Sequence, residues 1–137
     1  MDIPILSTLI QGQFRQTPGL LAVLLFGSQI MGTARPDSDI DLAVLYDYNF
    51  IPTTMELWEI KEAISEKLQM PVDLICLNNA DTIIASQVLK NHKVLLVNDQ
   101  KKLSEYFMRI LIDYAELKEL RKAMEDTILQ REWDARS

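Results

Sequence analysis

Leu24-Leu25-Phe26-Gly27-Ser28, followed after ten residues by Asp39-Ile40-Asp41-Leu42, is the stretch that decides how this chain folds. An apolar run ends at a Gly-Ser corner, and a second apolar run starts with the two aspartates. Because side chains at i and i+2 of a strand point to the same face, a strand over 39–46 places the two carboxylates side by side and turns Ile40 into the core. Such neighbours stay ionised at little cost only with a cation between them. The corner offers backbone N–H groups and a hydroxyl to a phosphate. The stretch therefore predicts nucleotide chemistry that uses Mg²⁺.

Composition and charge exclude several classes of protein. The 137 residues are 48% apolar and carry a net charge of −6, which fits one globular domain over 1–137 and argues against a domain that clamps nucleic acid by its phosphates. Cys76 is the single cysteine, so no intramolecular disulfide forms, and its apolar surroundings predict a buried, inert thiol. Without a signal peptide or an apolar run of about 20 residues, we expect a cytoplasmic protein with no membrane contact.

Apolar spacing predicts alternating helices and strands, and so an α/β fold. We expect a small mixed sheet of four or five strands flanked by helices, with a core over about 4–99. The expected strands cover 20–26, 39–46, 72–77 and 94–97, and the expected helices cover 4–16, a short segment from Ser28 to Gly32, a segment from the Thr53–Glu56 capping box to Pro71, 81–89 capped by Asn79 or Asp81, and 100–131. His92 is expected in a turn, without a catalytic role.

The C-terminal helix is longer than the core is wide. Residues 100–131 at 1.5 Å per residue span roughly 45 Å. The distal part is expected to overhang the core, and its apolar side chains (Leu120, Met124, Ile128 and Trp133) are read either as core or as an interface with another protein.

Asp73 is a third candidate carboxylate. It interrupts the apolar strand 72–77, with Val72 and Leu74 pointing the opposite way. If this strand pairs beside strand 39–46, Asp73 joins Asp39 and Asp41 on one surface. Three carboxylates suit a site with one or two Mg²⁺ ions for phosphoryl or nucleotidyl transfer, because a hydroxyl is a poor nucleophile near neutral pH without such help.

Gly27-Ser28, ten residues, Asp39-Ile40-Asp41 and a later Asp73 together resemble the active-site signature of nucleotidyltransferases related to DNA polymerase beta. A Gly-Ser pair alone is typical of a tight turn, and Asp-x-Asp alone is common. Joined at this spacing they are specific. The chain length and the long C-terminal helix resemble the minimal nucleotidyltransferases, and among them the MntA-type antitoxins encoded beside a HEPN-domain ribonuclease toxin. The resemblance covers about residues 5–100 strongly and the last helix more loosely.

The resemblance implies a role for each matched residue. Gly27 and Ser28 would bind the nucleotide phosphates, Asp39 and Asp41 would hold Mg²⁺, and Asp73 would be a further metal ligand or the general base. Antitoxins of this kind transfer AMP from ATP to a tyrosine of the partner toxin and so silence its RNase activity. Arg35, in the loop before the aspartates, is read either as an additional phosphate contact or as a solvated cation.

Two other functions stay open. One is a nucleotidyltransferase that acts on a small molecule such as an aminoglycoside, although the chain has no second domain to build the acceptor pocket. The other is an antitoxin that acts by binding alone and keeps its carboxylates without using them.

Overall fold

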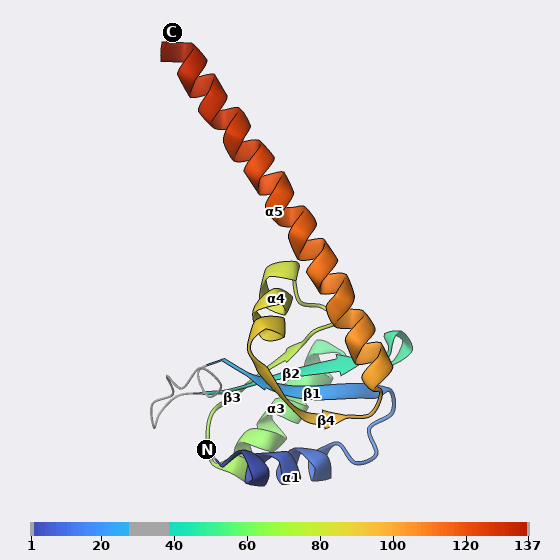
Figure 1. The fold of residues 1–137 in the computed structure, drawn as a ribbon. Coiled ribbons are helices and arrows are strands. Elements are labelled where there is room, and N and C mark those ends of the chain that lie inside the picture. The colour runs from blue at the N-terminus through green and yellow to red at the C-terminus, as the bar shows by residue number, and fades with distance from the viewer. Residues whose placement is uncertain (1, 28–38, 137) are drawn as a thin grey trace.

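Four strands of the described chain form one mixed sheet with helices on both faces (Figure 1). The computed structural model describes residues 2–27 and 39–136. Its elements in chain order are α1 (Ile3–Gln13), β1 (Leu20–Phe26), β2 (Ile40–Tyr46), the 3-10 helix η1 (Tyr48–Phe50), α3 (Thr54–Leu68), β3 (Val72–Cys76), α4 (Thr82–Lys90), β4 (His92–Val97) and α5 (Gln100–Arg136). The expected α/β class is confirmed. The short helix expected from Ser28 to Gly32 lies outside the described residues.

The sheet has the strand order β3-β2-β1-β4. β1 is antiparallel to both of its neighbours, and β3 runs parallel to β2. The parallel pair needs a crossover, which α3 provides. Consequently the C-terminal end of β1 and the N-terminal ends of the other three strands lie at the same end of the sheet.

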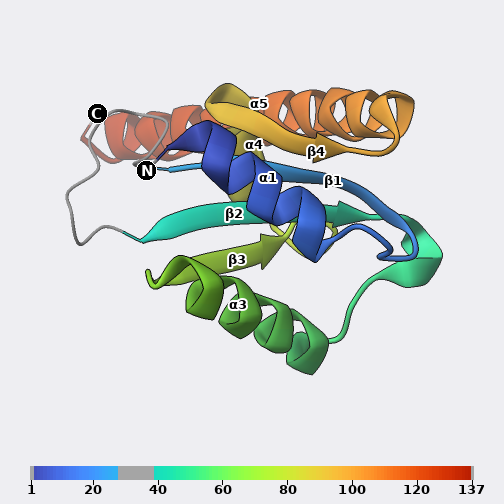
Figure 2. The same cartoon turned by 90° about the horizontal axis from the view of Figure 1, so that it is seen from below.

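Apolar side chains of the sheet build one core layer on each face. α1 and α3 cover the first face (Figure 2). Ile10, Leu25, Leu42 and Ile64 are almost fully buried there. α4 and α5 cover the second face. Its core layer is built by Leu24, Ala43, Leu77, Val88, Leu103 and Ile110. Strands covered on both faces read as continuous apolar runs, as the sequence of β1 does.

The helices over the sheet begin where the sequence predicts. Thr53 Oγ1 accepts from the N–H of Glu56 at 3.1 Å, and Glu56 Oε1 accepts from the N–H of Thr53 at 3.2 Å, which completes the capping box of α3. Asp81 caps α4 by accepting from the N–H of Ile84 at 2.8 Å.

Two element boundaries differ from the expected ones in ways that matter for the site. β2 begins at Ile40, so Asp39 precedes the strand instead of starting it. β4 begins at His92, and the expectation of a turn there is wrong because His92 pairs with Phe26 of β1. Short strands have too few apolar residues to mark their own starts.

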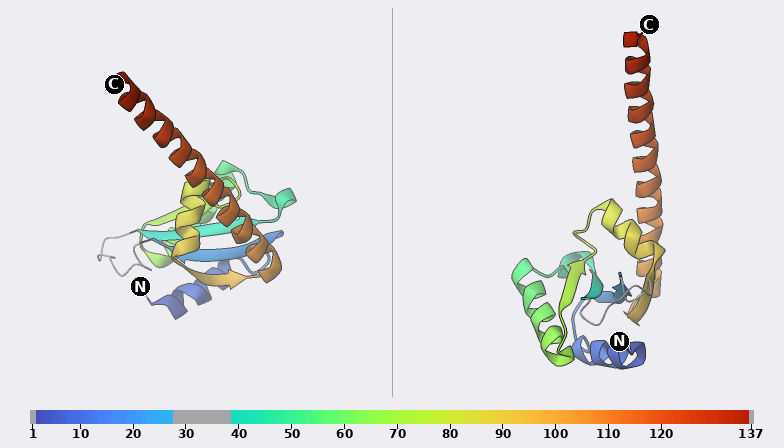
Figure 3. Two further views of the ribbon diagram at one scale, coloured as in Figure 1. Left: turned by 45° about the horizontal axis from the view of Figure 1, so that its top comes forward. Right: turned by 90° about the vertical axis from the view of Figure 1, so that its left-hand side faces the viewer.

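α5 extends far beyond the domain that it packs on (Figure 3). Its 37 residues make a helix of roughly 55 Å. The side chains that it buries, Leu103, Tyr106 and Ile110, all belong to its first third. Of the helices in the described ranges, none is long and apolar enough to span a bilayer.

Candidate active site

At the end of the sheet where β1 finishes, one residue from each strand contributes to a row across the strands. In register, Asp73 of β3 lies beside Asp41 of β2, Asp41 beside Phe26 of β1, and Phe26 beside His92 of β4. Partners in register point to the same face of a sheet. Phe26 packs in the core layer under α4 and α5, so the whole row faces those helices. The two carboxylates therefore sit on adjacent strands, directly opposite each other.

Gly27 brings the end of β1 against the Asp41 carboxylate. The φ angle of Gly27 is +78°, a left-handed conformation that glycine adopts at little cost. A Cβ built on this backbone would collide with Asp41 Oδ2. Glycine is therefore required twice, by the turn and by the close approach of the carboxylate. This contact joins the two halves of the sequence motif in space. We name Gly27, Asp41 and Asp73 the carboxylate end of the sheet.

Asp39 does not share the register position of the other two aspartates. It is exposed just before β2 and lines a groove with the last two turns of α3 and with Val72. Among the described residues, no three His, Cys, Asp or Glu side chains gather closely enough to form a group that could hold a metal ion. The strand register thus brings Asp41 next to Asp73, whereas Asp39 lies two residues before Asp41, in the groove beside α3. Ser28 and Arg35 lie outside the described residues.

The carboxylate pair has the chemistry of a Mg²⁺ site. Like charges directly opposite each other on neighbouring strands destabilise a sheet, and a divalent cation removes that repulsion. Mg²⁺ is bound in many enzymes by one or two carboxylates together with substrate phosphates, without a full cage of protein ligands. Asp41 is half-buried and Asp73 exposed, so an ion held between them would face solvent and substrate.

The opposite end of the sheet is closed by hydrogen bonds within the protein. Asn78, which follows β3, accepts from the N–H of Tyr46 at 2.9 Å and donates to the carbonyl of Tyr46 at 2.8 Å. Tyr106 of α5 donates its hydroxyl to the carbonyl of Leu77 at 3.0 Å. Lys102 Nζ lies 2.6 Å from Asp47 Oδ2. We name Tyr46, Asp47, Asn78, Lys102 and Tyr106 the far end of the sheet.

The far-end tyrosines are unsuited to acid–base work at neutral pH. Burial raises the pKa of Tyr46 to about 12, and the nearby Cys76 and Glu56 act in the same direction. Burial likewise raises the pKa of Tyr106 to about 12. Both phenols therefore stay protonated and serve as structural groups. Burial also raises the pKa of the Cys76 thiol, which keeps it in the unreactive form.

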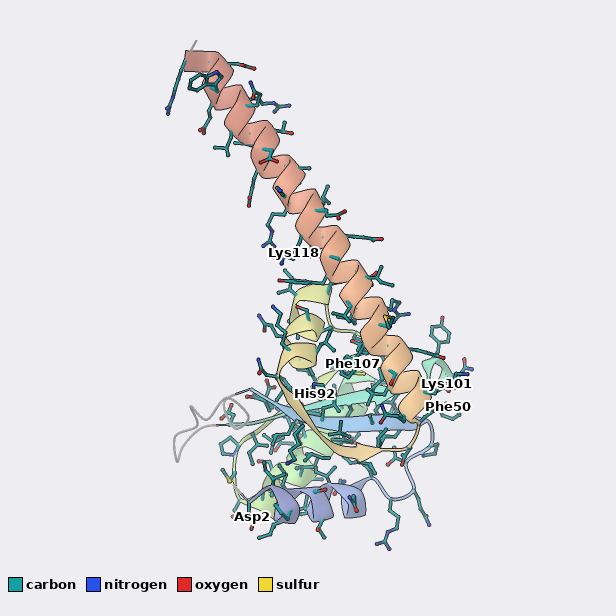
Figure 4. The ribbon with its side chains drawn as sticks, in the orientation of Figure 1. Asp2, Phe50, His92, Lys101, Phe107 and Lys118 are labelled. Carbon is teal, nitrogen blue, oxygen red and sulfur yellow. The ribbon has the colours of Figure 1, made fainter. Side chains whose placement is uncertain are left out.

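Sequence reasoning missed the position of His92. Its ring lies between α4 and α5 on the same face as the aspartates, and Figure 4 shows it beside Phe107. The signal available in the sequence was weak, since a single histidine between Asn91 and Lys93 carries no periodicity. Only the register of β4 against β1 reveals its place in the row.

Similarity to known proteins agrees with this geometry. Residues 9–101 match the family described as "Polymerase beta, Nucleotidyltransferase". A relative from Shewanella oneidensis, named protein adenylyltransferase MntA, is 32% identical over 113 residues, which are 82% of this chain and 78% of the relative. Another protein of that name, from Thermococcus cleftensis, is 30% identical over 89 residues, which are 65% of this chain and 88% of the relative.

Solved structures give the same result for the fold. A toxin–antitoxin structure with AMP-PNP contains a chain that is 29% identical, with a TM-score of 0.77 and coverage of 90% of this chain and 98% of that one. A structure of the tri-AMPylated Shewanella oneidensis HEPN toxin with its MNT antitoxin has a TM-score of 0.75 and 26% identity, and covers 93% and 99% of the two chains. On these grounds the chain belongs to the polymerase beta family of nucleotidyltransferases, together with the MntA protein adenylyltransferases.

Proposed function

We propose that this chain is an antitoxin that transfers AMP from ATP to a tyrosine hydroxyl of a HEPN-family toxin, with Mg²⁺ as cofactor. The observation that carries the proposal is the carboxylate end itself. Asp41 and Asp73 lie in register, and Gly27 is held against Asp41 by a turn that only glycine adopts comfortably. Relatives that share the fold at 26–29% identity are antitoxins crystallised with AMP-PNP or with an AMPylated toxin.

The residues would divide the reaction between them. Gly27 and Ser28 would bind the phosphates, and Arg35 would add a further phosphate contact. Asp39 and Asp41 would hold Mg²⁺, which when bound neutralises the triphosphate charge, and Asp73 would be a further ligand or the general base. Asp39 would contribute its carboxylate from its place just before β2, where it lines the groove beside α3.

The transfer is a displacement at the α-phosphorus. The tyrosine oxygen attacks that phosphorus, and the bond from it to the oxygen that bridges the α- and β-phosphates breaks. Pyrophosphate leaves with the electron pair of that bond. The phenol proton passes to a carboxylate, for which Asp73 is suited because it is exposed at the outer strand of the sheet, where the acceptor can approach.

We further propose that the toxin covers the distal half of α5. Leu103, Tyr106 and Ile110 pack on the core, and the same helical stripe continues through Leu120, Met124 and Ile128 with no cover from the described chain. These three distal side chains are 53–59% exposed. A stripe of this kind favours a helix packed along it. The solved relatives are complexes with a toxin, and they match 90–93% of this chain.

The function is tested by incubating the purified chain with its toxin, ATP and Mg²⁺ and measuring the intact mass of the toxin. We expect a gain of one or a few AMP groups, lost with Asp41→Asn and with Asp73→Asn. Asp47→Asn is the matched control, because it makes the same chemical change at the far end of the same sheet. Neutralisation by Asp41→Asn at equal stoichiometry, without any mass gain, would establish the binding-only antitoxin. A toxin left unmodified and unbound would favour a small-molecule acceptor.

The docking surface has its own matched pair of variants. Met124 and Met108 are 58% and 60% exposed, but at 3.6 residues per turn they lie on nearly opposite sides of α5. Met124→Glu should weaken binding of the toxin about tenfold or more, and Met108→Glu should leave it unchanged. Calorimetric titration of each variant with the toxin decides. Equal affinities for the two variants would move the interface elsewhere.

A further inference from the structure

His92 is held rigidly by two helices. Its Nδ1 lies 2.9 Å from the carbonyl oxygen of Val88 and 3.2 Å from that of Leu89, both in the last turn of α4. Its ring stacks on Phe107 of α5, with 5.0 Å between the ring centroids and 29° between the planes. Because carbonyl oxygens only accept hydrogen bonds, Nδ1 carries a hydrogen and donates it. The tautomer and the direction of the ring are therefore both fixed.

The second ring nitrogen has no such partner. Among the described residues, no hydrogen bond reaches Nε2 of His92. No side-chain nitrogen or oxygen of the described chain is both fully buried and unsatisfied, so Nε2 keeps contact with solvent. Capping the C-terminus of α4 accounts for Nδ1, as it does for many histidines at helix ends. It leaves the orientation of Nε2 without a structural purpose.

The position of His92 in the row across the sheet suggests a function for Nε2. Phe26 separates it from Asp41, and two strand spacings of about 4.8 Å put the two backbones roughly 10 Å apart. Phe26 directly precedes Gly27, so His92 flanks the Gly27 corner on the side away from the carboxylates. This end of the sheet therefore carries carboxylates on β3 and β2 and the His92 imidazole on β4.

We propose that Nε2 of His92 binds the β- and γ-phosphates of the nucleotide, the part that leaves as pyrophosphate. The inference rests on the proposed nucleotidyl transfer. With the α-phosphate at the carboxylates, a triphosphate that extends along the row passes the Gly27 corner and reaches His92. In the imidazolium form Nε2–H donates to a phosphate oxygen while Nδ1–H keeps its bond to Val88. His92 then determines specificity for a triphosphate over AMP.

Two substitutions separate the functions of the two ring nitrogens. His92→Asn keeps an amide near the position of Nδ1, and so the bond to α4, but removes Nε2. His92→Gln extends an amide donor to the position of Nε2. Lys93→Gln is the control, because this neighbour points to the other face of β4. Unfolding midpoints of all three variants report whether the cap on α4 is intact.

The measurement is titration of each variant with AMP-PNP and, separately, with AMP, in the presence of Mg²⁺ and without the toxin. We expect His92→Asn to weaken AMP-PNP about tenfold and AMP hardly at all, since a hydrogen bond to a charged group is lost. His92→Gln should recover most of the affinity, and Lys93→Gln should match the unsubstituted chain. Equal losses for both nucleotides, no loss for AMP-PNP, or no binding of AMP-PNP by the unsubstituted chain would each overturn the inference. Binding without AMP transfer to the toxin would overturn the proposed function alone.

Discussion

The two ends of the sheet treat polar groups in opposite ways. At the far end, each polar side chain is matched to a partner of complementary chemistry, as Asn78 is to both backbone groups of Tyr46 and Lys102 is to Asp47. At the carboxylate end, Asp41 and Asp73 are placed directly opposite each other although they carry the same charge. The first arrangement stabilises the fold. The second places like charges next to each other, which is what a site for a cation and a phosphate requires.

The largest expected difference between the ends is the response to replacing an aspartate. Asp41→Asn should lower AMP transfer more than about a hundredfold, because a metal ligand is lost, and should remove the like-charge repulsion with Asp73. Asp47→Asn should keep full activity and lose some stability, because its ion pair with Lys102 is lost. Mass spectrometry of the toxin and urea unfolding of the two variants measure both quantities. Destabilisation by Asp41→Asn would show that the carboxylate has a structural role.

The next difference concerns two glycines. Gly27→Ala places a Cβ against Asp41 at a φ of +78° and should cost about 1–3 kcal/mol of unfolding free energy. It should also displace the carboxylate and so reduce AMP transfer. Gly12 lies near the end of α1 with no atom within 4 Å of the added Cβ, and Gly12→Ala should stabilise the chain by about 0.5 kcal/mol. Thermal unfolding of both variants checks the opposite signs. A stable and active Gly27→Ala would rule out the close approach.

At the far end, Asn78→Ala should reduce stability and leave catalysis alone. The substitution removes two hydrogen bonds to the backbone of Tyr46 at a half-buried position and should cost about 2 kcal/mol. The ATP dependence of AMP transfer should be unchanged, because Asn78 follows the C-terminal end of β3 and Asp73 lies near its start. Denaturant unfolding and initial rates at a temperature below the unfolding transition test both statements. A loss of rate without a loss of stability would contradict the separation of the two ends.

The two ends also differ in how well the sequence predicted them. The motif predicted the carboxylate end, because Gly27, Asp41 and Asp73 stand in a fixed pattern around apolar strands, and strand pairing then brought Asp41 and Asp73 together. Period-two alternation alone did not place Asp39, since β2 begins one residue later and the chain there lies against α3. The far end could not be predicted at all.

The reason is that far-end contacts join residues distant in sequence. Asn78 and Tyr46 are 32 positions apart, and Lys102 and Asp47 are 55 apart. Nothing local in the chain marks such pairs, whereas capping boxes and turn residues act over three or four positions. His92 belongs to the same class, because only the pairing of β4 with β1 defines its neighbours.

The smallest expected effect is the pH dependence of the Asp47–Lys102 pair. The hydrogen bond from Lys102 lowers the pKa of Asp47, with further help from the Lys102 charge and from the N–H groups of Tyr48 and Asn49. The same bond raises the pKa of Lys102. The lowered pKa of Asp47 means that its carboxylate stabilises the fold above pH 3.9 or so, about the unfolded pKa of aspartate. This stabilisation is lost as the pH falls through the pKa of the folded state. The raised pKa of Lys102 means that its ammonium group stabilises the fold below pH 10.4 or so, about the unfolded pKa of lysine, and this stabilisation is lost as the pH rises through the pKa of the folded state.

The difference in stability between the unsubstituted chain and Asp47→Asn should therefore be constant near neutral pH and disappear both in acid and in strong alkali. It should shrink in high salt because both groups are exposed. Urea unfolding of the two proteins across this pH range measures it. A difference in stability that persists at pH 2 would have to come from the backbone around η1 and not from the charges. The far end would then be stabilised by this loop and not by the Asp47–Lys102 ion pair.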